Sequence, residues 1–238
     1  MNRRNFTKIC TSIVISASST LAEHAQSSSK VSFQRSLLQA GKSGDLLASE
    51  LIVGEPYLFF YPFVTTPCLL IKLENSIPNN NTNTSNDKWL GGVGPENSIV
   101  AYSAICSHKM SHPAKEISFI NYRHDPISFY NRDKGETVKK AGVISCCSER
   151  SVYDPAQGAK VLSGPAPHPL AAIELDYNET NDTLNAIGSY GADMYDRFFE
   201  KFGFRASMEH KIEDPKTMAS ETVEVQKLSD YSRQTIKC

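Results

Sequence analysis

The sequence predicts an all-β protein with one helix near its C-terminal end. Short apolar runs recur along the chain, and several alternate apolar and polar residues with the period of a half-buried strand. The asparagine-rich stretch 78–88 and turns rich in Gly and Pro separate these runs. No internal repeat or long helical periodicity is present, so the 238 residues predict one good core with extensions.

The expected strands follow one another in order along the chain. The run 68–73 is almost entirely apolar, which is typical of a buried strand. The segments 117–120 and 127–130 alternate, which predicts half-buried strands. A closing hairpin is expected around Asn181 and Asp182. The full set of expected strands is 68–73, 98–102, 117–120, 127–130, 142–145, 171–175 and 184–188.

The helix and the flanking segments complete the predicted organisation. A helix is expected over 192–202, because four large apolar residues fall near one face there. Residues 26–48 are polar and serine-rich, which predicts a linker, and the polar residues 206–238 predict a loose C-terminal tail. The folded domain is therefore expected over 49–205. The four apolar residues of the helix are Met194, Phe198, Phe199 and Phe202.

Residues 1–25 predict an export signal. Arg3 and Arg4 precede an apolar run, 9–17, that is too short for a comfortable membrane span. The paired arginines resemble a twin-arginine signal, whose pathway exports proteins already folded with their cofactors. An ordinary signal is the alternative, and retention of the segment as a membrane anchor stays open. We therefore expect a periplasmic protein.

Charge and cysteine content narrow the function classes. The chain has 25 Lys and Arg against 26 Asp and Glu, whereas a nucleic-acid-binding surface needs a strong basic excess, so no nucleic-acid partner is expected. Six cysteines are too few for a disulfide scaffold, and their clustering near histidines favours metal chemistry. Cys68, Cys106, Cys146 and Cys147 lie in the predicted domain, whereas Cys10 lies in the signal and Cys238 is expected to be an unpaired tail thiol.

Two short segments carry the residues suited to this chemistry. Cys106 and His108 place a thiolate and an imidazole two residues apart, and Cys146 and Cys147 open a second segment. Thiolates suit iron–sulfur clusters, and imidazoles can replace two of the four thiolates. Neutral imidazoles leave such a cluster less negative, so it accepts an electron more easily, at roughly −150 to +300 mV against about −400 mV for all-thiolate ferredoxins.

These segments resemble the Rieske family. Its pattern is Cys-x-His, a gap, and then Cys-x-x-His followed by a serine, an aromatic residue, a glycine turn and a proline loop. Here Ser151, Tyr153, Gly158 and the proline loop 164–170 follow in that order. The resemblance covers about 95–190, and 50–75 is similar to the family's base domain.

The resemblance implies an antiparallel β-sandwich with a small cluster-binding subdomain. A [2Fe-2S] cofactor would lie between the loops 104–113 and 145–170. The long spacing between the two ligand pairs implies an inserted hairpin over 115–142. Ser151 and Tyr153 match the respiratory branch, in which they hydrogen-bond to cluster or cysteine sulfur.

The family's inter-loop disulfide is expected to be missing. Its positions hold Ser111 and Ser148 or a neighbour, as in members similar to the arsenite-oxidase small subunit.

The fourth expected ligand is degenerate, and two alignments are possible. Cys147 as the ligand places Arg150 in the histidine position, and this is the alignment we expect. Cys146 as the ligand places Glu149 there and keeps the usual step to the aromatic residue. An arginine stays protonated and offers no lone pair to iron. Glu149 or His168 is then a substitute donor, or the cluster is weakened or lost.

Three functions compete at this point. The leading one is an electron-transfer subunit of an oxidoreductase, passing single electrons between a quinol or molybdenum enzyme and a cytochrome. It would not be an enzyme by itself. A cluster-free interaction protein with the same fold is the second. The third is a mononuclear metal site with Cys106, His108 and Cys147 as ligands, which zinc accepts tetrahedrally.

Overall fold

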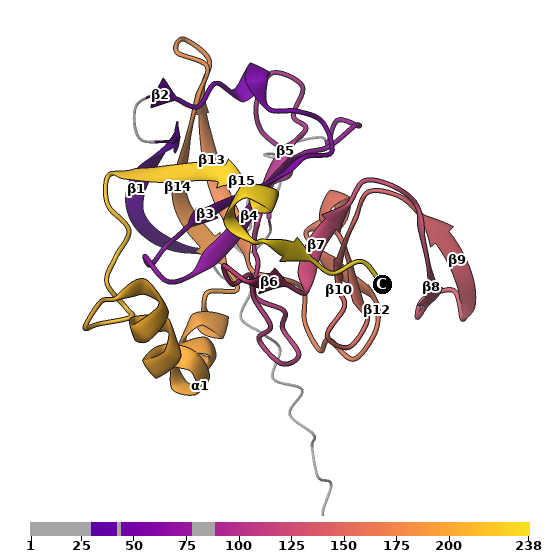
Figure 1. Ribbon diagram of the computed structural model, residues 1–238. Coiled ribbons are helices and arrows are strands. Elements are labelled where there is room, and N and C mark those ends of the chain that lie inside the picture. Colours follow the sequence, from indigo (N-terminus) through magenta and orange to yellow (C-terminus); the bar gives the residue numbers. More distant parts are fainter. Residues whose placement is uncertain (1–29, 42–43, 78–88) are drawn as a thin grey trace, which may run out of the picture.

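The computed structural model describes residues 30–41, 44–77 and 89–238 and consists mainly of β-strands (Figure 1). The predicted all-β class is therefore confirmed. The predicted export signal and the asparagine-rich loop lie outside the described residues. No helix in the described ranges is both long and apolar enough to cross a membrane.

The larger of the two main sheets curls into a barrel-like base. Its first and last parts meet because β1 pairs with β14 on one side and with β15 on the other. The pairing of β1 with β15 is parallel, so the sheet is not purely antiparallel. The strands, in spatial order, are β14 (Thr183–Tyr190), β13 (Ala172–Asn178), β5 (Ile99–Ser103), β4 (Pro67–Lys72), β3 (Pro56–Phe60), β15 (Thr222–Lys227), β1 (Lys30–Ala40) and β2 (Gly44–Asp45).

A smaller four-stranded sheet lies beside this base and forms a separate subdomain (Figure 1). The segment between β7 and β10 folds out as the antiparallel hairpin of β8 and β9, within the predicted insertion. Strands β6 and β16 form a separate, short parallel pair. These strands are β12 (Lys160–Ser163), β11 (Ser151–Asp154), β10 (Val143–Cys146), β7 (Ile120–Arg123), β8 (Ile127–Asn131), β9 (Glu136–Lys140), β6 (Ile117–Ser118) and β16 (Gln234–Thr235).

Strand β4 shows why an unbroken apolar run was found in the sequence. Leu69 and Ile71 face a core shared with the small subdomain, whereas Cys68 and Leu70 face a second core inside the base. All four side chains have no exposed surface. Because β4 is covered on both faces, it needs apolar residues at every position rather than at alternate ones.

The predicted helix is confirmed, although it is longer than expected. Helix α1 (Asp193–His210) buries Met194, Phe198 and Phe199. These side chains pack with Ile105 and Met110, which lie in the loop after β5. The helix therefore supports one of the two predicted cluster loops. The remaining helices are α2 (Leu228–Tyr231) and the 3-10 turns η1 (Ala48–Glu50) and η2 (Pro155–Gln157).

Two predicted segments are wrong. The linker expected over 26–48 is, from Lys30 to Ala40, a strand of the base in which Ser36 and Leu38 are fully buried. The loose tail expected over 206–238 contains the last turn of α1, then β15 within the base sheet, α2 and β16. Both segments are polar on one face only. Their backbone groups pair with strands that are distant in sequence, and amino-acid composition does not reveal such pairing.

Candidate metal centre

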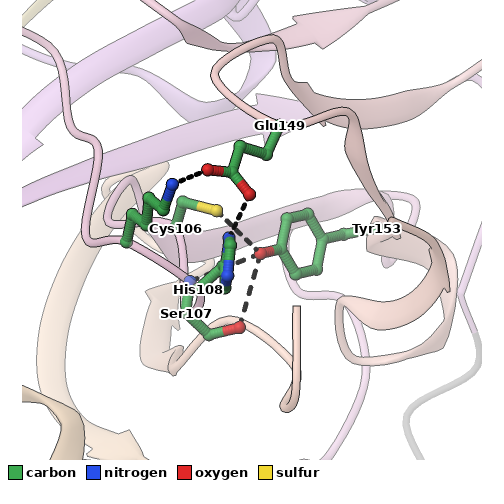
Figure 2. Close-up of polar contacts among 6 residues, drawn as sticks. Cys106, Ser107, His108, Glu149 and Tyr153 are labelled. Atoms are coloured by element: carbon green, nitrogen blue, oxygen red, sulfur yellow. Dashed lines mark hydrogen bonds and ion pairs between the residues drawn. The ribbon is translucent and has the colours of Figure 1, made fainter. Parts of the chain in front are cut away.

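Two loops meet at the end of the small subdomain (Figure 2). The first follows β5 and carries Cys106 and His108; the second is the tight turn between β10 and β11, and Cys146 ends β10 just before it. The Cys106 and Cys146 side chains are buried, with residue exposures of 3% and 1%. Neither is in a disulfide, and both belong to the core that joins subdomain and base.

The two cysteine thiols lie within hydrogen-bonding reach of each other. The Cys146 thiol donates to Cys106 and lowers the pKa of Cys106 to about 6, against the opposing effect of burial. A hydrogen bond from Tyr153 lowers the Cys106 pKa further. The same contact with Cys106 raises the pKa of Cys146, and burial adds to that rise. The contact thus favours ionisation of Cys106, which lies beside a second soft donor.

Tyr153 provides a buried hydroxyl for Cys106. It comes from β11, has no exposed surface, and places its Oη 3.2 Å from the Cys106 Sγ. The main-chain N–H of Ser107 donates to the same Oη at 3.3 Å. Burial raises the pKa of Tyr153, so the hydroxyl keeps its proton and can donate it to a thiolate. This is the contact expected for Tyr153 from the resemblance.

Ser151 is also brought to the cysteines, and its hydroxyl approaches Cys106 without an aligned hydrogen bond. It begins β11, is 1% exposed, and contributes to the lowered pKa of Cys106. A buried hydroxyl without an aligned hydrogen bond is unusual, because such burial has a free-energy cost. An acceptor placed between the loops, such as a cluster sulfide, would satisfy it. The site therefore fits an iron–sulfur group at this point.

His108 and Glu149 form the outer part of the site (Figure 2). The His108 Nδ1 lies 3.1 Å from the Glu149 Oε2, and the other carboxylate oxygen is ion-paired with Lys109. The two side chains are 27% and 32% exposed, so they face solvent while the cysteines do not. A nitrogen and an oxygen donor thus lie side by side above the two thiols.

The expected alignment through Cys147 and Arg150 is wrong. Cys147 forms a disulfide with Cys238, with Cα atoms 5.6 Å apart, so its sulfur is not available to a metal. Arg150 is exposed and ends the tight turn in the left-handed backbone region, at φ 59°. The structure instead brings Cys146 to Cys106 and Glu149 to His108, which is the other alignment.

The alternation of side chains along strand β10 explains why Cys146, and not Cys147, faces Cys106. Ile144 and Cys146 lie two residues apart and face the same core, whereas the next residue points to the opposite side. There Cys147 meets the C-terminal segment, in which the Ile236 N–H donates to the Ser118 carbonyl. Cys238 was expected to be unpaired. The two cysteines are 91 residues apart in sequence, so no local pattern indicated this disulfide.

The proline loop closes over the first cluster loop. The Ser107 Oγ donates to the main-chain carbonyl of His168 at 2.6 Å. His168 thus takes part through its backbone, and no contact among the described residues brings its ring to the cysteines. A side chain at Gly164 would meet the Arg150 carbonyl oxygen and come within 2.5 Å of the Ser151 Cα. The loop and the turn therefore touch backbone to backbone.

The donors come as two pairs rather than as one cluster. Within 30–41, 44–77 and 89–238, no three His, Cys, Asp or Glu side chains converge on a single position suited to one metal ion. Cys106 and Cys146 form one pair, and His108 and Glu149 form the other. Paired donors of this kind fit a cofactor with two metal ions better than a single zinc ion.

The chain has a distant likeness to a known protein. No family model matches the chain. Among solved structures, the chain is similar to the soluble domain of Rieske protein II (soxF) from Sulfolobus acidocaldarius. The identity is 26% and the TM-score 0.44, over 66% of this chain and 78% of that one.

Proposed function

We propose that this protein is a one-electron carrier of the Rieske type, with a [2Fe-2S] cluster held between its two loops. Cys106 and Cys146 would supply the thiolate ligands and His108 an imidazole ligand. The observation that carries the proposal is the buried pair of thiols with the Tyr153 hydroxyl 3.2 Å from one of them. When bound, such a cluster takes up and releases single electrons near the potentials of respiratory carriers.

The protein residues have separate tasks in this proposal. Burial of Cys106 and Cys146 keeps water from the sulfurs. The Tyr153 hydroxyl donates to the Cys106 sulfur, which favours the more negative, reduced state and so raises the potential. His108 is partly exposed and offers the route by which an electron would reach a docked partner.

The location and the partner are proposed on further observations. The paired arginines at the start of the sequence and the disulfide between Cys147 and Cys238 both suit an oxidising compartment outside the cytoplasm, such as the periplasm. A carrier there would serve a cytochrome on one side and a quinol or molybdenum oxidoreductase on the other. It would act as a subunit of that oxidoreductase.

Metal analysis tests the proposal. The protein is purified without oxygen, and iron, acid-labile sulfide and zinc are measured beside an electron paramagnetic resonance spectrum of the reduced sample. We expect about two iron and two sulfide per chain. Zinc alone would mean a mononuclear site, and a colourless, metal-free preparation would mean a cluster-free fold; either result overturns the proposal.

A further inference from the structure

Glu149 occupies the position that a histidine holds in the motif, and its carboxylate faces His108. It is the third residue after Cys146 and the fourth before Tyr153. Its Oε2 lies 3.1 Å from the His108 Nδ1. The turn 147–150 and the left-handed residue that ends it direct this carboxylate back over the first loop (Figure 2).

The two atoms approach closely without an aligned hydrogen bond. The His108 Nδ1 is buried and meets the Glu149 Oε2 at 3.1 Å, yet no hydrogen bond joins them. A buried ring nitrogen without an aligned hydrogen bond has a free-energy cost, and native structures seldom contain one. An imidazole nitrogen and a carboxylate oxygen that converge in this way are the arrangement that a metal ion between them would satisfy.

Lys109 supplies a positive charge to the same carboxylate. Its ammonium is ion-paired with the Oε1 of Glu149, on the oxygen that does not face His108. A carboxylate adds one negative charge where an imidazole would be neutral, and that charge opposes the uptake of an electron. A cation on the far oxygen offsets it. Lys109 is 58% exposed, so solvent screens part of this effect.

We propose that the cluster has a mixed ligand set in which the Glu149 carboxylate is the fourth ligand and Lys109 is its counter-charge. The inference rests on the proposed function and names the ligand that the motif left open. Cys106 and Cys146 would hold one iron, and His108 with Glu149 the other. Arg150 has no part in binding, because its side chain is exposed and carries no lone pair.

Variants at the two competing positions test the ligand assignment. Glu149→Ala is expected to lose most of its iron and sulfide when isolated without oxygen. Glu149→His is expected to keep the cluster, to change its electron paramagnetic resonance g values and to shift its reduction potential upward, because a neutral ligand replaces an anion. Arg150→His, one residue away, is the matched control and should leave the iron content and the g values as they are.

Two patterns would overturn the ligand assignment. One is a Glu149→Ala protein with the iron content and spectrum of the unchanged protein. The other is a spectrum that changes in Arg150→His and not in Glu149→His. Both require an unchanged protein that contains iron and sulfide, so they are distinct from the metal-free result that ends the proposed function. Because Glu149→His keeps a ligand in place, it separates loss of a ligand from loss of the fold.

Lys109→Gln tests the counter-charge. We expect the cluster content to stay and the reduction potential to shift downward, with a larger shift at low ionic strength. Lys134→Gln, in the exposed turn of the β8–β9 hairpin, removes the same charge away from the site and should leave the potential unchanged. An equal potential for the Lys109→Gln and the unchanged protein would overturn this part.

Discussion

The base and the small subdomain are stabilised in different ways. In the base, strands such as β4 are apolar throughout and pair with neighbours around a nearly closed sheet. In the subdomain the strands of the sheet are only four residues long. The two buried free thiols Cys106 and Cys146 lie where the subdomain meets the base. The base is held by burial, whereas the subdomain depends on close loop contacts, one disulfide and the cofactor that we propose.

The largest effect is expected where backbone meets backbone in the subdomain. Gly164→Ala places a Cβ against the Arg150 carbonyl and 2.5 Å from the Ser151 Cα, at a positive φ of 80°. Nothing flexible can move aside, so we expect about 4 kcal/mol of local destabilisation and loss of bound iron. Hydrogen exchange should show lost protection in β10 and β11 and intact protection in β4.

Gly41→Ala is the matched control for that change. Gly41 also has a positive φ, 62°, but its Cβ would meet nothing within 4 Å. Only the conformational cost of about 1 kcal/mol should appear in the free energy of unfolding. Equal effects of the two substitutions would show that the loop contact has no special importance.

A truncation in the base should destabilise the whole molecule. Leu70 is fully buried in the core of the base, and Leu70→Ala is expected to lower the free energy of unfolding by about 2–5 kcal/mol. Chemical denaturation followed by circular dichroism measures this. Ile52→Ala, at a residue that is 53% exposed, should change it by less than about 0.5 kcal/mol. Loss of the subdomain alone in Leu70→Ala would contradict the contrast between the two regions.

Removal of the disulfide should loosen the subdomain more than the base. Cys147 and Cys238 are 91 residues apart in sequence, and their bond holds the turn after β10 to the chain end. The double substitution Cys147→Ser with Cys238→Ser is expected to lower the free energy of unfolding by about 2–4 kcal/mol.

Hydrogen exchange gives the location of that effect, with early exchange expected in β16, β6 and β10. Cys68→Ser, at a buried free thiol of the base, controls for loss of a sulfur. Uniform loss of protection over base and subdomain would contradict a local role for the disulfide.

The smallest expected effect is a shift in the reduction potential of the proposed cluster, and the stability of the fold should not change. Tyr153→Phe removes the hydroxyl 3.2 Å from the Cys106 sulfur. We expect a lower reduction potential by up to about 59 mV, which corresponds to about 1.4 kcal/mol for one electron. Protein-film voltammetry measures it. Tyr130→Phe, at an exposed tyrosine of β8, should not shift the potential.

Local patterns predicted much of the fold and half of the site. The unbroken apolar run of β4, the alternation of β6 and β8 and the apolar face of α1 were visible in the sequence because each depends on neighbours along the chain. Cys106 and His108 were found for the same reason, since they share one loop. Tyr153 and Ser151 were placed by their order after the second cysteine pair.

The errors have a common physical origin. The strand from Lys30 to Ala40 and the strand in the C-terminal segment are polar on one face, and only their partners in the base make them strands. The choice between Cys146 and Cys147 depended on which side of β10 faces the core. It also depended on Cys238, which lies far away in sequence and close in space.

The sequence by itself determined which kinds of donor are present and in what order: soft thiolates, an imidazole, and either an arginine or a carboxylate where a second imidazole was expected. The tertiary structure alone decided which thiol faces the site and that Glu149 faces His108. The reason is that neighbouring side chains of a strand point to opposite faces. Which of two adjacent residues becomes a ligand therefore depends on which face packs against the core, and the local sequence does not specify that face.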